Sequence, residues 1–597
     1  MRTILRSTIA TLGACLAAAL TPASAAACGG FFCDQAQPVN QAAEGIIFAQ
    51  NDDGTVTAVI QIKYQGPSQS FSWLLPISSV PKSDADIGVA SNLAFQRLQT
   101  ATNPNYTLTT KIEGTCRPDK GGVLVGSAGS AAVFEEGGSG GGPDGVGGVT
   151  VEASGVVGSF EWTVISLDKS LPNPADVAVT WLTENGYDVP SSAPKLLASY
   201  LQQGLYLLAL RLTKGASVGS IRPIILNYEG TQPSIPVKLT AVAANNDMGV
   251  LTWVLGKSRS VPQNYLSLEL NEARINWFNA NSNYNSVVID AANDAGGQGF
   301  VTEFAGSSST LKSQIWTFSD ETNWSSFKST NFTTAAAFFN RAYPMYGAFD
   351  GFWDATRAAV TLPSGVTFTQ FQNCPSCYVN QISFTPATYL AELDKTVIQP
   401  VKRVQDLIDA HPQLTRMYTT LSADEMTLDP LFDFNADLPA VSNVHSAVRV
   451  IECNSHVGLG QAPWRIELPQ GGVLRGTAAQ VGTWPAELAQ LPPNRLIVRA
   501  GESGPGKVVE DNSAQINESL TAYNAGLPMP VTEGGAGGVA NGTAGADSNG
   551  EGGDHTTMRS GSSSDSGGCN IAGGSDPASV FVAATALGLA LLRRRRG

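Results

Sequence analysis

Alternating apolar and polar residues mark the first strands of the chain. Every second residue from Val56 to Tyr64 is apolar, and an apolar run at residues 46–50 precedes them across Asp53-Gly54. Alternation with a period of two predicts strands, and Asp-Gly favours a two-residue hairpin turn. We therefore predict a hairpin over residues 46–64, followed by a strand at 70–75 that Pro76 closes.

The next block alternates strands with paired helices. An apolar strand is predicted at residues 160–167. The first helix extends from Asn173-Pro174 to Gly186, because Asn suits the cap, Pro the first turn and Gly the C-terminal end. A second helix follows at 194–203, and then a strand at 205–212. Further elements are predicted as a helix that begins near Asp84 and as strands at 222–228, 237–243 and 250–255.

Helices dominate after about residue 285. Val397, Val401, Val404 and Ile408 share one helix face, which Pro400 should kink or divide. Strands return at 464–468 and 495–500. The densest aromatic cluster is expected to pack in the core; it consists of Phe338, Phe339, Tyr343, Tyr346, Phe349, Phe352 and Trp353.

These patterns predict an α+β fold, with a mainly antiparallel sheet and paired helices followed by a more helical second half. The domain should cover residues 28–512, with possible halves at 28–284 and 285–512. Residues 513–568 are predicted to be a disordered Gly/Ser-rich linker, because residues 531–568 hold twelve Gly and six Ser and no aromatic residue.

The N-terminus has the features of a secretory signal peptide. Arg2 and Arg6 precede an apolar run at residues 9–20, which is too short to span a bilayer. Small residues, including Ala25 and Ala27, form a site for signal peptidase. We expect residues 1–27 to be removed by the export machinery.

The C-terminus, residues 569–597, has the features of a sorting segment. Cys569 is followed by a short apolar helix at 578–592 and then by Arg593, Arg594, Arg595 and Arg596. This segment resembles the MYXO-CTERM type of tail, and the resemblance implies cleavage near the Cys by a dedicated protease and display at the cell surface. Residues 578–592 would anchor the chain in the membrane before processing. The alternative is an ordinary single-span membrane anchor that is not cleaved.

The composition of the chain argues against two classes of function, nucleic-acid binding and acid–base catalysis by histidine. With 36 Lys+Arg and 50 Asp+Glu the net charge is −14, which opposes general binding to nucleic acid. Only 4 His are present, so little acid–base chemistry is expected near neutral pH. His445 has no acidic or thiol neighbour at useful spacing in the sequence.

Several strings resemble the bacterial domain-of-unknown-function family 2330. The resemblance implies an exported protein of unassigned biochemistry and brings no catalytic residues. It covers about residues 28–455 through the strings CGGFFC (28–33), GTVTAVIQIKY (54–64), FSWLLPI (71–77), VTWLTENGYDVP (179–190), GFVTEFAG (299–306), CPSCY (374–378), LTRMYTTLSADEMTLDPLFDFN (414–435) and VSNVH (441–445).

An even number of cysteines in an exported chain favours disulfides. Between the two targeting segments these are Cys28, Cys33, Cys116, Cys374, Cys377 and Cys453. Local pairing of the first two and of the CxxC would leave Cys116 with Cys453, but fifteen pairings are formally open.

The alternative hypothesis for the function is an extracytoplasmic metal- or thiol-dependent enzyme that uses Cys374, Cys377, Cys453 and His456. These residues have the spacing of a tetrahedral zinc site, C-x-x-C with C-x-x-H. We favour a non-catalytic structural or binding protein without a cofactor, exported to the cell envelope and displayed at the outer surface of a Gram-negative bacterium.

Overall fold

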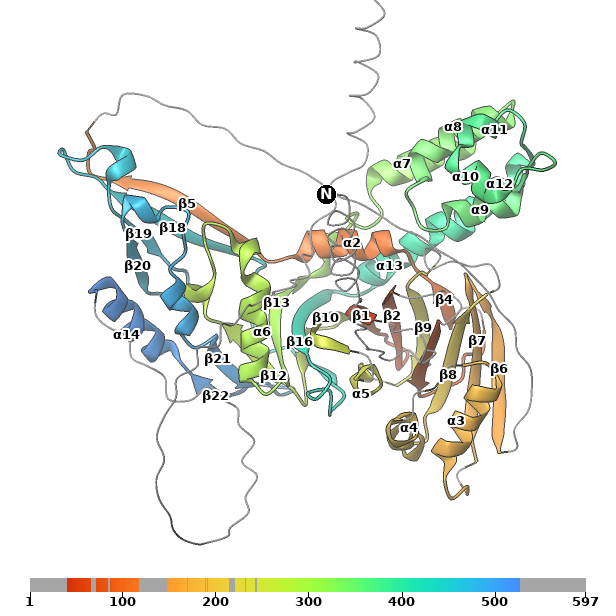
Figure 1. The fold of residues 1–597 in the computed structure, drawn as a ribbon, viewed down its shortest axis with the longest axis horizontal. Coiled ribbons are helices and arrows are strands. Elements are labelled where there is room, and N and C mark those ends of the chain that lie inside the picture. Colours follow the sequence, from red (N-terminus) through yellow and green to blue (C-terminus); the bar gives the residue numbers. More distant parts are fainter. Residues whose placement is uncertain are drawn as a thin grey trace, which may run out of the picture. The chain divides into compact units, whose positions relative to one another are not determined.

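A ten-stranded mixed sheet runs through the described part of the chain (Figure 1). The computed structural model describes residues 40–65, 71–83, 86–117, 148–168, 170–187, 189, 192–213, 221–230, 232–241 and 244–526. Neighbouring strands are antiparallel except for the parallel pairs β1–β10 and β12–β13. In spatial order the strands are β22 (Lys507–Asp511), β21 (Asn494–Arg499), β12 (Leu266–Leu270), β13 (Gly299–Ser307), β16 (Gln413–Leu421), β10 (Ala244–Gly256), β1 (Asn40–Gln50), β2 (Thr55–Gln65), β9 (Ile224–Glu229) and β4 (Ile87–Val89).

Two four-stranded sheets accompany it. The first has the order β3 (Ser72–Ile77), β8 (Tyr206–Leu212), β7 (Phe160–Leu167) and β6 (Val149–Val157). The second has the order β20 (Val473–Gly476), β19 (Trp464–Glu467), β18 (Val444–Glu452) and β5 (Asn105–Glu113). Two short ladders pair β11 (Arg259–Pro262) with β17 (Phe432–Asn435), and β14 (Val360–Thr361) with β15 (Ser383–Phe384).

Helices flank these sheets and dominate between β13 and β16. They are α2 (Asn92–Thr102), α3 (Pro174–Glu184), α4 (Ala193–Gln202), α5 (Val237–Thr240), α6 (Tyr284–Asp294), α7 (Phe318–Ser329), α8 (Ala335–Tyr346), α9 (Phe352–Ala359), α10 (Phe368–Asn373), α11 (Pro375–Tyr378), α12 (Pro386–Leu393), α13 (Gln399–Ala410) and α14 (Ser513–Asn524). Sheets that are mostly antiparallel, combined with these helices, confirm the predicted α+β class.

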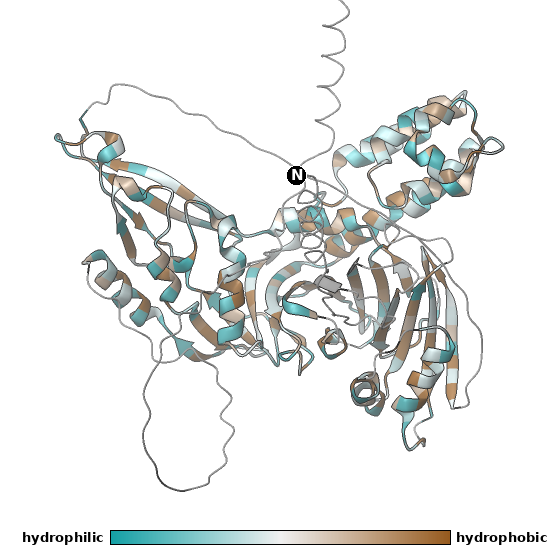
Figure 2. Cartoon of the chain, in the orientation of Figure 1, coloured by the Kyte–Doolittle hydropathy of each residue, from teal (hydrophilic) through white to brown (hydrophobic). Residues whose placement is uncertain are grey.

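The two faces of the ten-stranded sheet belong to different cores. Ile46 and Phe48 of β1 pack with residues of the β3–β8–β7–β6 sheet, such as Leu208. Ile47 and Ala49, which point the other way, belong to a core shared with helices α2 and α6 to α13. Because both faces are covered, the central strands are rich in apolar residues, and Figure 2 shows β8 on the facing sheet as similarly hydrophobic.

The first hairpin forms where predicted, but its turn is longer. Asn51–Gly54 connect β1 to β2: the Asn51 N–H donates to the Thr55 carbonyl over 2.9 Å, and Gly54 has a φ of +79°. Asp53 accepts from the Thr55 hydroxyl at 2.6 Å, which favours the longer loop. Strand β3 also passes through Pro76, which the sequence placed at its end.

Two predictions of local structure are wrong. Residues 237–240, predicted as strand, form the single helical turn α5, in which Val237, Leu239 and Thr240 are buried; a short apolar run does not distinguish the two structures. Helix α2 begins at Asn92 instead of near Asp84, because Ser91 caps it and the distant Asp350 carboxylate accepts from the Ser91 hydroxyl at 2.9 Å.

The predicted linker also starts too early. Residues 513–524 form helix α14, which contacts β20 and β21, and Ile516 and Leu520 are buried one turn apart. The described fold therefore continues through α14, beyond the predicted boundary at residue 512. The ten-stranded sheet takes strands from both sides of residue 284, so the two possible halves share one sheet.

The helical second half is present. A π-helical segment at Asp394–Ile398 precedes α13, and Pro400 lies in the first turn of α13, so the predicted division is confirmed. Most of the aromatic cluster is core: Phe338, Phe339 and Phe352 are at most 1% exposed. Tyr343 is 41% exposed and lies at the edge of the cluster.

Helix α7 provides a test of local stability. The Thr317 backbone N–H donates to Asp320 over 2.9 Å in a capping box, and Arg97 forms an ion pair with Asp320 at 2.7 Å. Burial opposes ionisation of Asp320, but these hydrogen bonds outweigh it and lower the pKa of the carboxyl. We expect Asp320→Ala to lower the free energy of unfolding by about 1–2 kcal/mol at pH 7 in urea denaturation.

The pH dependence has a definite sign. Since folding lowers the pKa of Asp320, the stabilisation is present above the pKa of the unfolded chain, about 3.9, and is lost as pH falls through the lower pKa of the fold. The variant should therefore approach the wild type in acid. Ser319→Ala, at an exposed neighbour, is the control; an equal loss in both variants would contradict this account.

Three predicted segments lie outside the described residues. They are the signal peptide at 1–27, the remainder of the linker at 527–568 and the sorting segment at 569–597 with its apolar helix. Across residues 40–526, where described, no helix combines the length and apolar character needed to cross a membrane.

Candidate functional site

The predicted cysteines form two disulfides within the described residues. Strands β5 and β18 run parallel and end together at Glu113 and Glu452, and a disulfide joins Cys116 to Cys453 just beyond them. The Cys453 N–H donates to the Glu113 carbonyl over 2.8 Å, which continues the ladder to the bridge. The bond closes a separation of 337 residues.

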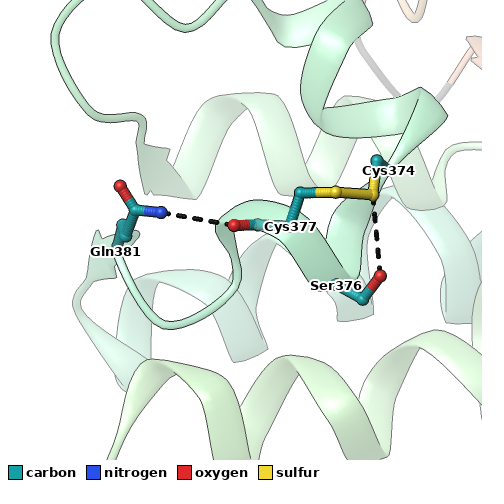
Figure 3. The surroundings of a disulfide bond; sticks show 4 residues. All are labelled: Cys374, Ser376, Cys377 and Gln381. Atoms are coloured by element: carbon teal, nitrogen blue, oxygen red, sulfur yellow. Dashed lines mark hydrogen bonds between the residues drawn. A yellow bond between two sulfur atoms is a disulfide. The ribbon is translucent and has the colours of Figure 1, made fainter.

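The second disulfide joins Cys374 to Cys377 (Figure 3). Cys374 is the N-cap of α11, and Gln381 donates to the Cys377 carbonyl over 3.2 Å. Helix α11 has only four residues. These are two of the three pairs considered from the sequence; the third, Cys28 and Cys33, lies outside the described residues, as do Ala25, Ala27, Cys569 and Arg593–Arg596.

The four residues of the alternative metal site are not brought together. The sulfur of Cys453 is bonded to Cys116, and those of Cys374 and Cys377 are bonded to each other. His456 is exposed, and its backbone N–H donates to Asn454. No group of three or more His, Cys, Asp or Glu side chains suited to a metal occurs among the described residues.

A different set of residues converges on a cavity of about 530 Å³. The cavity lies where β5 and β18 meet β12, β13 and the loop 438–442. We call it the Glu272 cavity. Its polar lining includes Tyr106, Arg259, Glu272, Tyr284, Glu303 and His445, and apolar side chains such as Leu268 and Val441 complete the wall. Its size falls within the range of small-molecule sites.

His445 is held by a carboxylate from a distant segment. Its Nδ1 lies 2.5 Å from Oε1 of Glu272, which is only 4% exposed. The parallel register places His445 opposite Tyr106, and their rings stack with centroids 4.5 Å apart. The other oxygen of Glu272, Oε2, is buried and accepts no hydrogen bond from any described residue.

Burial of that oxygen is unfavourable because no described residue donates a hydrogen bond to it. A buried carboxylate oxygen without a donor loses its hydration and gains no hydrogen bond in exchange. The backbone fixes it there: Asn271 caps the 3₁₀ turn Glu272–Arg274, and Gln470 accepts from the Glu272 N–H at 3.1 Å. A rigid turn therefore holds the carboxylate of Glu272 in the wall of the cavity.

A buried ion pair forms another wall. Arg416 of β16 and Glu303 of β13 are 4% and 3% exposed, with Nε and Oε2 2.5 Å apart. Tyr284 donates to the other oxygen of Glu303. Arg416 also donates to Thr102 over 3.1 Å, and its guanidinium lies over the Trp253 ring. Every oxygen of Glu303 therefore has a donor.

The tyrosines of the cavity remain protonated. Burial, together with the negative charges of Glu272 and Glu303, raises the pKa of Tyr106 well above its usual value. Burial and the negative charge of Glu303 likewise raise the pKa of Tyr284 well above its usual value. Both hydroxyls are thus neutral hydrogen-bonding groups at physiological pH.

Arg259 is the positive group of the lining whose charge has no carboxylate partner among the described residues. Its Nη1 donates to the Pro439 carbonyl over 2.9 Å, and its buried Nε has no hydrogen-bond partner there. Burial lowers the pKa of Arg259. Glu269, also in the lining, is instead held by Arg495 through two contacts of 2.7 Å.

The acidic partner of His445 could not be found from the spacing of residues in the sequence. Its acidic neighbour exists but lies 173 residues away in the chain, so local spacing does not reveal it. One signal was present: the strings that carry the family resemblance after residue 298 contain Glu303, Arg416 and His445. Each of these three residues contributes to the cavity or to the ion pair behind it.

Residues 22–314 match the model of a family described as an uncharacterized protein conserved in bacteria, DUF2330. The similarity to the DUF2330 family is therefore confined to these residues. The match ends before the strings at 374–378, 414–435 and 441–445, on which the wider resemblance rested. The DUF2330 region supplies Tyr106, Arg259, Glu272, Tyr284 and Glu303, whereas Arg416 and His445 follow it. No curated protein and no solved structure matches the chain.

Proposed function

We propose that the protein is an exported, non-catalytic binding protein of the bacterial cell envelope, which holds a small amino-acid-like zwitterion in the Glu272 cavity. One observation carries this proposal: Glu272 lines the cavity, and its buried Oε2 has no hydrogen-bond donor among the described residues. A protonated amine would supply the missing donor and charge. Charge-assisted hydrogen bonds of this kind are roughly twice as strong as neutral ones.

The opposite charge of the ligand follows from Arg259. Its unpartnered Nε and its uncompensated charge favour a carboxylate in the same cavity. The apolar wall and the Tyr106 ring suit a hydrophobic or aromatic side group. The other acids, Glu269 and Glu303, are already neutralised by Arg495 and Arg416, so Glu272 is the acid that the amine would meet.

The arrangement favours binding over catalysis. Glu303 is fixed by Arg416 and Tyr284, and Glu272 holds His445 in one orientation. Groups locked in this way recognise a ligand at little entropic cost. The charges of the cavity are thus arranged to complement a ligand that carries both signs.

The location in the envelope is supported by chemistry at both ends of the chain and between them. Disulfides persist in oxidising compartments, and the described residues contain two. The signal peptide at 1–27 would engage the export machinery. Residues 578–592 of the MYXO-CTERM-like tail would then anchor the chain in the membrane. A sorting protease would cleave near Cys569, and the domain would remain on the outer surface of a Gram-negative cell.

Three probes that differ only in their charged groups test the ligand class. L-phenylalanine has both charges, phenethylamine has only the amine, and 3-phenylpropionate has only the carboxylate. In calorimetric titration we expect L-phenylalanine to bind best and 3-phenylpropionate worst. Glu272→Gln should weaken binding of the two amines at least about tenfold, because a charged hydrogen bond of about 1.5–3 kcal/mol is lost.

The control is Glu269→Gln, which removes the same charge from the same wall at a site that Arg495 already occupies. It should leave the affinities for the amines unchanged. Arg259→Gln should lower the affinity for L-phenylalanine but not the affinity for phenethylamine. If neither amine binds, or if Glu272→Gln binds them like the wild type, the proposed ligand class is wrong.

A further inference from the structure

We propose that a second cavity, between the ten-stranded sheet and the β3–β8–β7–β6 sheet, binds a neutral lipid-like molecule with a hydroxyl or similar uncharged head. The cavity measures about 470 Å³ and shares no lining residue with the Glu272 cavity. This inference can therefore be tested independently of the function proposed above. We call it the intersheet cavity.

A small residue of the ten-stranded sheet lies in the lining of this cavity. On the face of the ten-stranded sheet that meets the other sheet, Phe48, Ala58 and Leu226 lie side by side in register on β1, β2 and β9. Ala58 is 1% exposed and lines the cavity between its two larger neighbours. Packed sheets normally fill such a position with interdigitating side chains. The short methyl makes this a point of the lining where a larger side chain would extend into the cavity.

The walls are apolar and rigidly held. Ile46, Ile60 and Leu75 continue the lining on the two sheets. The loop that carries Leu428 and Leu431 is fixed, because Asn264 donates to the Asp429 carbonyl over 2.7 Å and accepts from the Leu431 N–H at 2.8 Å. A preformed apolar cavity with few polar groups is the usual form of a small-molecule site.

The polar end of the cavity has no net charge. The Lys238 Nζ lies 3.8 Å from Oδ2 of Asp429, and the Lys238 backbone N–H donates to Oδ1 over 3.0 Å. Tyr200, which is 3% exposed, also lines this end, and its hydroxyl interacts with Asp429. At the lining, Glu229 is held by Lys82 over 2.7 Å. A charged head group would therefore face charges that are already paired and would gain no net attraction. A hydroxyl can form hydrogen bonds with the same groups.

Displacement of a neutral fluorescent probe, N-phenyl-1-naphthylamine, from the purified protein tests this inference. Three competitors share a twelve-carbon chain: dodecanol, dodecanoate and dodecylamine. We expect dodecanol to displace the probe at concentrations at least about tenfold lower than either charged competitor. Equal displacement by all three, or no binding of the probe, would overturn the inference.

Two variants locate the binding. Ala58→Leu places a larger side chain in the lining and should reduce the affinity for probe and dodecanol at least about tenfold, whereas Ala423→Leu, at an exposed position, should change neither. Tyr200→Phe keeps the apolar wall, so the probe should bind as in the wild type while the affinity for dodecanol falls about three- to tenfold. Wild-type competition by dodecanol in both Ala58→Leu and Tyr200→Phe would place the ligand elsewhere. Glu272→Gln should leave all of these values unchanged.

Discussion

Glu303→Gln should lower the free energy of unfolding by about 3–5 kcal/mol, because it leaves the buried guanidinium of Arg416 without its counter-charge. The substitution keeps the size of the side chain, so the loss reports charge more than packing. Urea denaturation followed by tryptophan fluorescence measures it, since Trp253 lies beside Arg416.

A surface pair provides the control. Lys82 and Glu229 are also 2.7 Å apart but largely exposed, and Glu229→Gln should cost no more than about 1 kcal/mol. In Glu303→Gln combined with Arg416→Met, where both charges are gone, we expect part of the stability to return. A loss below about 1 kcal/mol for Glu303→Gln alone would show that the pair contributes little to the fold.

Removal of the Cys116–Cys453 disulfide by paired Ser substitutions should cost about 3–5 kcal/mol. A cross-link constrains the unfolded chain more as the loop it closes grows, and this one closes 337 residues. The same pair of substitutions at Cys374 and Cys377, separated by only 3 residues, is the matched control and should cost about 1–2 kcal/mol. Urea denaturation of the oxidised proteins compares the two.

The ordering of the two variants is the informative result. Mapping of the disulfides by mass spectrometry in the wild type establishes that both bonds are formed before the comparison. If loss of the Cys374–Cys377 bond were the more costly, stabilisation by closure of the long loop would not explain the role of Cys116 and Cys453.

Local patterns predicted much of the fold because they depend on neighbouring residues. The strand at 160–167 and the two helices after it follow from apolar periodicity and from Asn, Pro and Gly signals within a few positions. The start of α2 could not be predicted in this way, since Asp350, which binds its cap, lies 259 residues away from Ser91. The same limit applies to α5, whose Lys238 N–H donates to Asp429.

The candidate site depends almost wholly on long-range pairing. Parallel pairing of β5 with β18 brings Tyr106 to His445, and β13 beside β16 brings Glu303 to Arg416. Neither pairing has a signal in the spacing of these residues. The cysteine spacing, which is visible in the sequence, instead suggested a metal site whose residues the fold keeps in separate disulfides.

Nitrogen NMR of selectively ¹⁵N-histidine-labelled protein tests the binding site most directly, because the chain has only 4 His. The signals of His445 are assigned by comparison with His445→Gln. On titration with L-phenylalanine they should shift saturably in the wild type and in Glu269→Gln, whereas Glu272→Gln should need ligand concentrations at least about tenfold higher for the same shift, and the signals of His411 and His456 should stay in place. Unchanged His445 signals in the wild type, or a titration of Glu272→Gln with the same midpoint as the wild type, would contradict a ligand held by the Glu272 carboxylate.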